Sequence, residues 1–217
     1  MLAGKLRAYA NRPDVIVLAL PRGGVPVAFE VARALKAPLD VMIVRKLGTP
    51  DQPELAMGAI ASGGVRVLNE ELLRYHPIPD ILIESVAARE QKELERRERL
   101  YRGVRPAPDV RGRTVILVDD GIATGTTMRS AVEALKKLGA AGVVIAVPVA
   151  PESVCDEFQR LRDHVAFTCL ATPEVFFAIS LWYENFPQTS DEEVRDLLKR
   201  AAEEIATAPV KSQSKVT

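Results

Sequence analysis

A hydroxyl-rich loop that follows two adjacent carboxylates is the part of the sequence best suited to chemistry. The apolar run 115–118 ends in Asp119 and Asp120, and a loop of small residues, 121–127, leads into a segment with apolar residues at helical spacing. The apolar run predicts a strand buried on both faces. Because ligands of open α/β sheets bind beyond the carboxyl ends of the strands, we expect a binding site here.

The residue types in this loop suit a sugar phosphate. Gly121 and Gly125 permit close approach of the backbone, and Thr124, Thr126 and Thr127 add hydroxyl groups. Free N–H groups at the start of the following helix would bind a phosphate monoester. The adjacent carboxylates would repel a second phosphate but accept hydrogen bonds from neutral hydroxyls. A phosphate with two nearby hydroxyls describes a ribose 5-phosphate.

This segment resembles the 5-phosphoribosyl-1-pyrophosphate (PRPP) motif of the type I phosphoribosyltransferases, in which an apolar strand, an acidic pair and Ala-Thr-Gly-Thr-Thr follow one another. The resemblance implies that Asp119 and Asp120 bind the ribose hydroxyls. It also implies that the 5-phosphate is bound by Ala123, Thr124, Gly125, Thr126 and Thr127. The plain alternative is an ordinary strand–turn–helix, which has no use for a hydroxyl-rich loop.

A second turn with two glycines, Pro21-Arg22-Gly23-Gly24, also follows an apolar run and opens an expected helix. It should therefore lie at the same edge of the sheet as the acidic pair. The turn resembles the family's pyrophosphate loop, which implies that Arg22, Gly23 and Gly24 bind the diphosphate. The resemblance also predicts a cis peptide between Pro21 and Arg22. The alternative is a glycine turn with a surface arginine.

The basic pair Arg45-Lys46 is expected directly after a second strand, 39–44. It resembles the pair that precedes the catalytic loop of adenine-type members. This implies that Lys46 acts with Arg22 on the departing pyrophosphate, as a catalytic and diphosphate-binding residue. An equally good interpretation is that Arg45 and Lys46 only extend from the end of a strand into solvent.

Two more segments are expected around the reacting centre. The loop 48–56 would be a mobile lid, and its acidic residues, Asp51 and Glu54, receive no role. An aromatic segment, 176–186, follows the last strand, where family members place part of the base pocket. Phe176, Phe177 and Trp182 could stack a base there, although a core or dimer contact made by these aromatic side chains is at least as good an interpretation.

The composition excludes several classes of protein. The 217 residues include 29 Lys and Arg and 29 Asp and Glu, so the chain carries no net basic charge for nucleic acid. No apolar run has the length of a signal peptide or a membrane span. Cys155 and Cys169 are too few for a disulfide framework. We therefore expect a cytoplasmic protein without a nucleic-acid or membrane partner; a homodimer is compatible with the chain.

The predicted fold is α/β: a three-layer, mainly parallel twisted sheet flanked by helices, with a mobile loop and hairpin and a small C-terminal hood. Strands are predicted over 15–20, 39–44, 114–118, 143–147 and 165–170, with helices over 25–35, 81–101, 127–138, 151–161 and 191–206. A hairpin is predicted at 57–60 and 65–68. The charged residues of the long helix should form a solvated face.

One domain is expected over residues 1–208, followed by a flexible tail, 209–217. The family resemblance covers a core of about 14–170. The insertion 48–105 and the C-terminal segment 171–208 match no substrate-defining subgroup.

The resemblance implies transfer of a 5-phosphoribosyl group from PRPP to a purine or pyrimidine, as in nucleotide salvage. Pyrophosphate would leave, and Mg²⁺ would be held by PRPP without direct protein ligands. Ala123 replaces the Asp of 6-oxopurine members, which argues against hypoxanthine and guanine. Two alternatives remain: a PRPP-binding regulatory protein without turnover, and a phospho-acceptor receiver domain. A receiver domain, however, has its acidic pair at the first strand.

Overall fold

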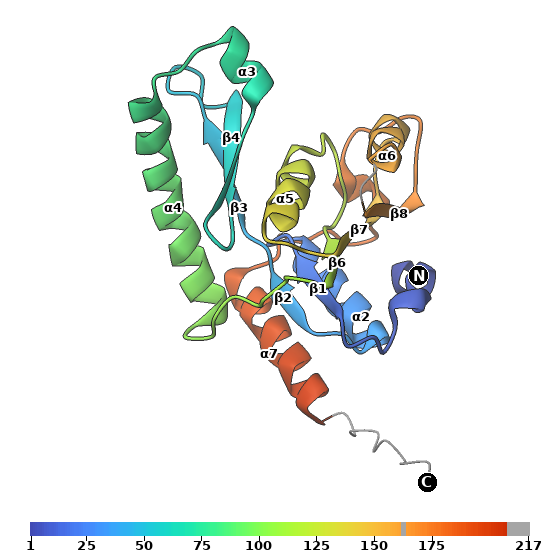
Figure 1. The fold of residues 1–217 in the computed structure, drawn as a ribbon. Helices are drawn as coiled ribbons and strands as arrows, with labels where there is room; N and C mark the ends of the chain where they lie inside the picture. Colours follow the sequence, from blue (N-terminus) through green and yellow to red (C-terminus); the bar gives the residue numbers. More distant parts are fainter. Residues whose placement is uncertain (162–163, 208–217) are drawn as a thin grey trace.

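A five-stranded parallel sheet forms the centre of the molecule. The computed structural model describes residues 1–161 and 164–207 (Figure 1). The sheet has the strand order β2-β1-β6-β7-β8, and all four strand pairs are parallel. Its strands are β1 (Val15–Ala19), β2 (Leu39–Val41), β6 (Thr114–Val118), β7 (Gly142–Val149) and β8 (Val165–Ala171). The predicted α/β class is confirmed.

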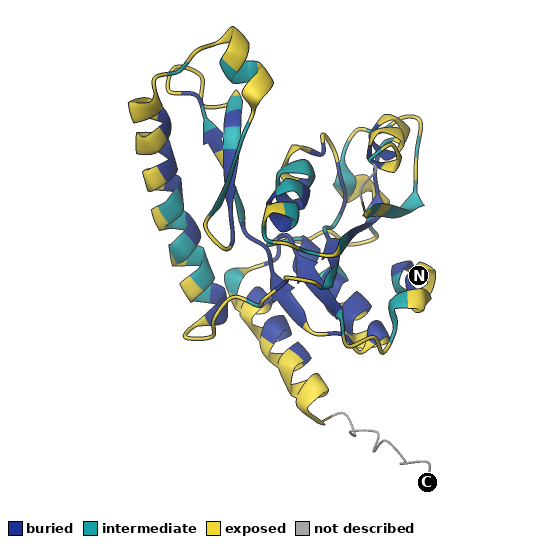
Figure 2. Ribbon diagram, in the orientation of Figure 1, coloured by how far each residue is buried: buried dark blue, intermediate teal, exposed yellow. Residues whose placement is uncertain are grey.

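Both faces of this sheet are covered by helices, because successive side chains of each strand point to opposite sides. Val17 and Ile116 pack in one core cluster, and their neighbours Leu18 and Leu117 pack in another. The first cluster includes residues of α1 (Leu2–Lys5), α2 (Gly24–Leu35) and α7 (Asp191–Thr207), and the second includes residues of α5 (Thr126–Lys137) and α6 (Glu152–Gln159). Figure 2 shows the central strands buried between these layers.

A second, antiparallel sheet stands beside the first and contains the predicted hairpin. Its strands are β3 (Val44–Gly48), β4 (Ala56–Ala61) and β5 (Val65–Leu68), in the order β3-β4-β5. The long helix α4 (Asp80–Arg102) packs against β3 and β4, while α5 contacts all three strands. Figure 1 shows this unit with α3 (Glu70–Tyr75) at the end farthest from α7.

The predicted second strand, 39–44, is wrong in its extent. Pairing with β1 ends at Val41, although the Met42 N–H still donates to the Ala19 carbonyl oxygen at 2.8 Å. Val44 instead pairs with Ala61 in the small sheet. Met42 and Ile43 are buried where the chain crosses between the sheets, so the apolar run continues without a break. Arg45 and Lys46 therefore lie within β3 and do not follow a strand of the main sheet.

The predicted solvated face of α4 is also only partly correct. Arg102 is 5% exposed and donates to Asp40 Oδ1 at 2.8 Å and to the Val41 carbonyl oxygen at 2.6 Å. Its Nη1 donates to Glu98 at 2.7 Å. A guanidinium is buried here because carboxylate and carbonyl oxygens accept from it. This contact fixes the C-terminal end of α4 to β2.

Several short elements have no clear pattern in the sequence. They are α1, α3, and the 3-10 turns η1 (Arg7–Tyr9) and η2 (Ile179–Trp182). The α3 helix is capped by Asn69, whose Oδ1 accepts from the Leu72 N–H at 3.0 Å. Within the described residues, no helix combines the length and apolar character that a membrane crossing requires. The predicted tail, 209–217, lies outside the described residues.

Candidate functional site

The two predicted loops meet because their strands are neighbours. Strands β1 and β6 pair in parallel up to Ala19 and Val118. The Leu20 N–H then donates to the Val118 carbonyl oxygen at 2.8 Å, which extends the pairing to the start of both loops. The turn at 21–24 and the acidic pair therefore lie side by side at the carboxyl edge of the sheet, as predicted from their positions after the strands.

Gly23 and Gly24 pack directly on the acidic pair. A Cβ on Gly23 would meet Asp120 Oδ2 and lie 2.7 Å from its Cγ. A Cβ on Gly24 would lie 2.8 Å from the Val118 carbonyl oxygen and 2.9 Å from Asp119 Cα. At Gly24 the backbone leaves no room for a side chain, whereas a side chain at Gly23 would have to displace the Asp120 carboxylate. The peptide between Pro21 and Arg22 is cis, which confirms that prediction.

Burial raises the pKa of both carboxyls of the acidic pair. Burial, and then the charge of Asp120, raise the pKa of Asp119 well above its usual value. Burial also raises the pKa of Asp120. Asp119 Oδ1 accepts the N–H of Asp120 at 2.9 Å, which fixes its orientation. The pair therefore holds a proton more readily than free carboxyls, and hydroxyl donors would favour its ionised form.

The loop after the acidic pair is shaped by Gly125 and held by Arg129. Gly125 has φ +77°, and a Cβ there would lie 2.9 Å from the Phe158 ring, so only glycine fits. Arg129 donates to the Thr124 carbonyl oxygen and to Glu157 Oε1, each at 2.7 Å. The guanidinium thus ties the loop to α6 from outside.

This loop leaves donors free at the start of α5. Among the described residues, no side chain caps α5, so its first-turn N–H groups remain open to a ligand. Thr124, Thr126 and Thr127 are exposed, and the hydroxyl oxygens of Thr124 and Thr126 lie 3.4 Å apart. Open amides, hydroxyls and the positive end of the helix are together suited to bind an anion.

The C-terminal hood is the segment between β8 and α7, and its residues Tyr183 and Ile179 contact the acidic loop. The Tyr183 hydroxyl donates to the Asp120 carbonyl oxygen at 2.6 Å. Burial and the two Asp charges raise the Tyr183 pKa, so the hydroxyl remains a donor. Ile179 packs over Gly121, where a Cβ would lie 2.9 Å from Ile179 Cγ2.

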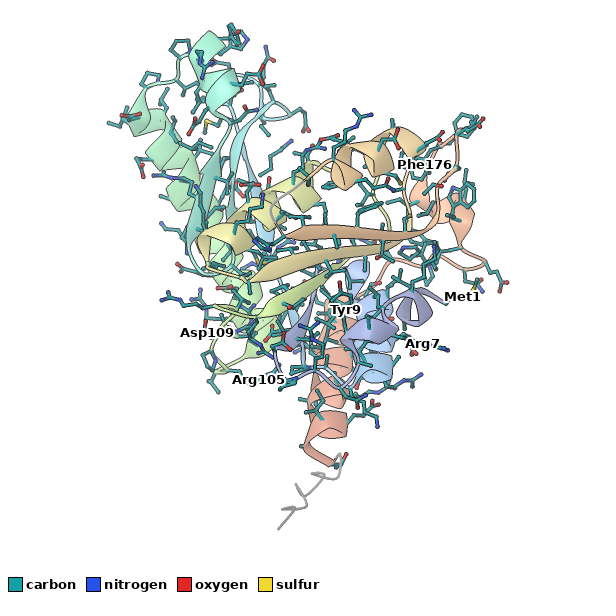
Figure 3. The ribbon with its side chains drawn as sticks, turned by 45° about the vertical axis from the view of Figure 1, so that its right-hand side comes forward. Met1, Arg7, Tyr9, Arg105, Asp109 and Phe176 are labelled. Atoms are coloured by element: carbon teal, nitrogen blue, oxygen red, sulfur yellow. The ribbon has the colours of Figure 1, made fainter. Side chains whose placement is uncertain are left out.

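The aromatic residues predicted to stack a base are mostly exposed. Phe177 is 83% exposed and Trp182 47%, while Phe176 is half-buried. Figure 3 shows Phe176 on the opposite side of the molecule from Asp109, which lies in the loop between α4 and β6. The hydrogen bond from this segment to the acidic pair comes from Tyr183, which the sequence placed in the same segment without distinguishing it.

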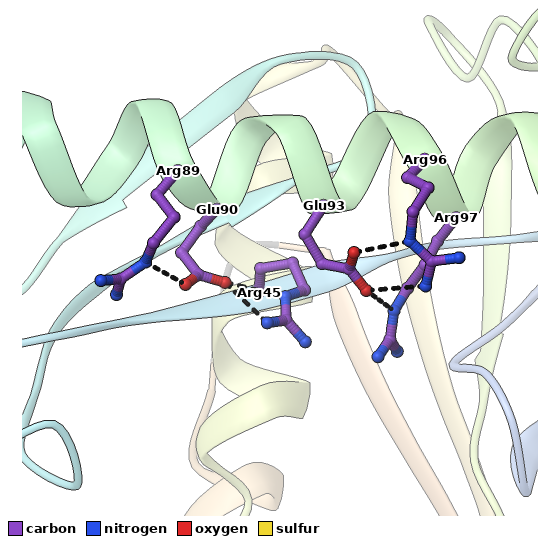
Figure 4. A network of polar contacts seen from close by, with 6 residues as sticks. All are labelled: Arg45, Arg89, Glu90, Glu93, Arg96 and Arg97. Carbon is purple, nitrogen blue, oxygen red and sulfur yellow. Dashed lines mark hydrogen bonds and ion pairs between the residues drawn. The ribbon is translucent and has the colours of Figure 1, made fainter.

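Arg45 and Lys46 are both engaged by carboxylates. Arg45 donates through Nε and Nη2 to Glu90 Oε2 of α4, at 3.0 and 2.7 Å (Figure 4). Lys46 Nζ lies 3.0 Å from Glu54 Oε2, in the loop predicted to be a lid. The Lys46 pair is exposed, and such pairs contribute only about 0.2–1 kcal/mol. Lys46 can therefore be released readily, whereas Arg45 is tied to α4.

Three residues of this region were not singled out by the sequence: Arg129, Tyr183 and Asp191. Asp191 begins α7 and lies 3.9 Å from Arg22 Nη1. The only sequence signal near it is the Ser190–Glu193 capping pattern, and Ser190 Oγ accepts the Glu193 N–H at 3.1 Å. That signal marks a helix start and does not indicate a contact with Arg22.

Comparison with known proteins agrees with this geometry. Residues 1–155 match the family model of the phosphoribosyl transferase domain. A protein of Mycobacterium tuberculosis that carries the provisional name phosphoribosyl transferase is 49% identical over 207 residues. That alignment covers 95% of this chain but 46% of the relative, so the chain spans about half the length of the curated relatives it matches.

A solved structure is similar to this chain over most of its length. The crystal structure of the protein TT1426 from Thermus thermophilus superposes with a TM-score of 0.80 at 40% identity, over 92% of this chain and 93% of that chain. A shorter stretch of 62 residues is 42% identical to a ribose-phosphate pyrophosphokinase of Pyrococcus furiosus. This stretch covers 28% of this chain and 22% of that protein.

Proposed function

Because this chain belongs to the phosphoribosyl transferase domain family, we propose that it transfers a 5-phosphoribosyl group from PRPP to a nitrogenous base and releases pyrophosphate. The observation that carries the proposal is the packing of Gly23 and Gly24 on Asp120 and Asp119. This packing brings the loop that we propose for the diphosphate next to two carboxylates suited to ribose hydroxyls. The loop that we propose for the 5-phosphate follows these carboxylates directly in the sequence.

In this proposal, each part of PRPP has its own contacts. The open amides and hydroxyls of residues 123–127 bind the 5-phosphate. Asp119 and Asp120 accept hydrogen bonds from the ribose 2- and 3-hydroxyls. The backbone at Gly23 and the Arg22 guanidinium bind the diphosphate. Gly24, whose N–H already donates to the Leu20 carbonyl oxygen at 3.1 Å, lets the backbone approach closely.

The difficult step is the cleavage of the bond between ribose C1 and the diphosphate. Positive charge develops on the ring, and the buried acidic pair beside it favours that charge. Negative charge develops on the leaving group, where Arg22 and a released Lys46 would stabilise it. No covalent nucleophile is needed, because the nitrogen of the base attacks C1 itself.

In this proposal a magnesium ion enters the site as a partner of the substrate. Within residues 1–161 and 164–207, no three His, Cys, Asp or Glu side chains cluster as metal ligands. Mg²⁺ prefers phosphate oxygens and water over an all-protein cage, so it would be held by PRPP next to Asp119 and Asp120. When bound, the ion supplies Lewis-acid stabilisation of the leaving diphosphate.

The acceptor is the least defined part of the proposal. Ala123 argues against 6-oxopurines, because the Asp that serves them in related proteins is replaced here. Phe176, Phe177 and Trp182 are the proposed stacking residues, and the exposure of Phe177 and Trp182 leaves these two rings free to contact a base.

The test is a screen for pyrophosphate release with PRPP, MgCl₂ and a panel of nucleobases. We expect release with at least one base, and a loss of at least about 100-fold in the Asp119→Asn/Asp120→Asn double variant. Asp156→Asn is the matched control, because Asp156 is exposed on α6. Binding of PRPP without turnover on any base would favour the regulatory alternative, and absence of PRPP binding would overturn the proposal.

A further inference from the structure

Three side chains from distant parts of the sequence meet beside the turn at 21–24. The Tyr101 hydroxyl, at the end of α4, donates to Asp191 Oδ1 at 2.6 Å. The same Asp191 oxygen lies 3.9 Å from Nη1 of Arg22. A carboxylate on the C-terminal helix therefore links the long helix of the insertion to the arginine of the proposed diphosphate loop.

The position of the Asp191 carboxylate is well defined. Tyr101 is 4% exposed, and burial together with Asp191 raises its pKa to about 12, so its hydroxyl remains a donor. The N–H of Glu193 bonds to Ser190 Oγ at 3.1 Å, which fixes the start of α7. The side chains of Arg22 and Asp191 are 35% and 43% exposed, and Arg22 faces Asp191 through one nitrogen.

Carboxylates and arginines both lie near Asp191. The first turn of α7 contains three acidic residues, Asp191 included. Arg96 and Arg97 of α4 both bond to Glu93, as Figure 4 shows. The charges of Arg97 and Arg22 act against the rise in the Tyr101 pKa, which places both near the Tyr101–Asp191 pair. The Asp191 carboxylate attracts the guanidinium of Arg22, which faces it at 3.9 Å.

We propose that Asp191, held by Tyr101, is a positioning residue that orients Arg22 toward the diphosphate of PRPP; this inference rests on the proposed function. A guanidinium carries five N–H donors in a rigid fork. With Nη1 facing Asp191, Nε and Nη2 remain available to oxygen atoms of the ligand. Without the carboxylate, Arg22 has more orientations to lose on binding.

The test compares two ligands that differ in the diphosphate. Asp191→Asn retains an oxygen acceptor for Tyr101 but removes the charge that faces Arg22. We expect the Kd for PRPP with Mg²⁺, measured by calorimetry, to rise about threefold, while the Kd for ribose 5-phosphate stays unchanged. Glu192→Gln removes the same charge from the first turn of α7 and should change neither Kd, because Glu192 is exposed beside Asp191.

Tyr101→Phe is the second variant and removes only the hydroxyl that holds Asp191. It should also raise the Kd for PRPP and leave the Kd for ribose 5-phosphate unchanged. The inference would be overturned by an unchanged or lower Kd for PRPP, or by an equal loss of affinity for PRPP and for ribose 5-phosphate. If wild-type protein bound ribose 5-phosphate but not PRPP, the proposed function itself would fail, which is distinct from a failure confined to the variants.

Discussion

The Tyr183 hydroxyl lies 2.6 Å from the carbonyl oxygen of Asp120 and donates a hydrogen bond to it. This bond joins two segments 63 residues apart, the C-terminal hood and the loop that carries the acidic pair. It acts on the backbone of Asp120 and leaves the carboxylate free for a ligand. The hood is therefore part of the support of the proposed ribose site.

Tyr183→Phe should lower the stability of the protein without unfolding it. The change removes one hydrogen bond and leaves a part-buried carbonyl oxygen without its donor, at a cost of about 1 kcal/mol. In a chain of this size that corresponds to about 2–4 °C in Tm. Thermal unfolding measures the difference. Tyr75→Phe is the control because Tyr75 is 71% exposed, and an equal loss in both variants would contradict the prediction.

Gly23→Ala should weaken PRPP binding at least about tenfold, because the methyl group would displace the Asp120 carboxylate. The backbone of Gly23 has φ −58° and ψ −31°, which alanine adopts freely, so the effect comes from the contact alone. Gly4→Ala adds the same methyl group where nothing lies within 4 Å. Calorimetry with PRPP and Mg²⁺ distinguishes the two variants; equal affinities would count against the packing described above.

Asp119→Asn should be more stable than wild type at pH 8. The pKa of Asp119 is raised in the folded protein, so the folded state binds its proton more tightly than the unfolded chain does. The contribution of Asp119 to wild-type stability therefore falls as the pH rises from about 4, the ordinary Asp value, through the raised pKa. Asparagine has no proton to lose.

Thermal unfolding between pH 4 and pH 8 checks this sign. We expect a Tm difference in favour of Asp119→Asn that is largest at pH 8 and shrinks toward pH 4. Asp156→Asn, at an exposed position, should have a free energy of unfolding within about 0.5 kcal/mol of wild type at both pH 4 and pH 8. A wild type that is more stable than Asp119→Asn at pH 8 would contradict the buried, repelling pair.

Arg102→Ala should destabilise the protein by about 3–5 kcal/mol, because it leaves the buried Asp40 carboxylate without its ion pair. Arg99→Ala is the matched control. It breaks the neighbouring i,i+4 pair with Glu95, whose two side chains are 70% and 45% exposed and lie 4.0 Å apart. That change should cost less than about 1 kcal/mol. Urea unfolding of both variants measures the contrast, and similar losses would mean that burial does not distinguish the two pairs.

Local patterns in the sequence determined most of the main sheet and the hairpin of the antiparallel sheet. The strand at 114–118 and the hairpin at 57–68 are read from β-forming residues and turn residues that act within a few positions. The acidic pair and the loop 123–127 are also local, since one strand end and one helix start define them. Ser190 and Glu193 likewise marked the start of α7 correctly.

Tertiary structure decided what distant segments do together. Apolar residues run without a break through Met42 and Ile43, so only pairing partners reveal that the chain changes sheets there. The burial of Arg102 depends on Asp40, 62 residues away. The contacts of Tyr183 with Asp120 and of Asp191 with Arg22 join the C-terminal segment to the site, and no local pattern carries such a pairing. The sequence by itself determined which chemical groups the loops present, whereas the fold decided which side chains hold those groups in place, because these contacts depend on distance in space and not on spacing along the chain.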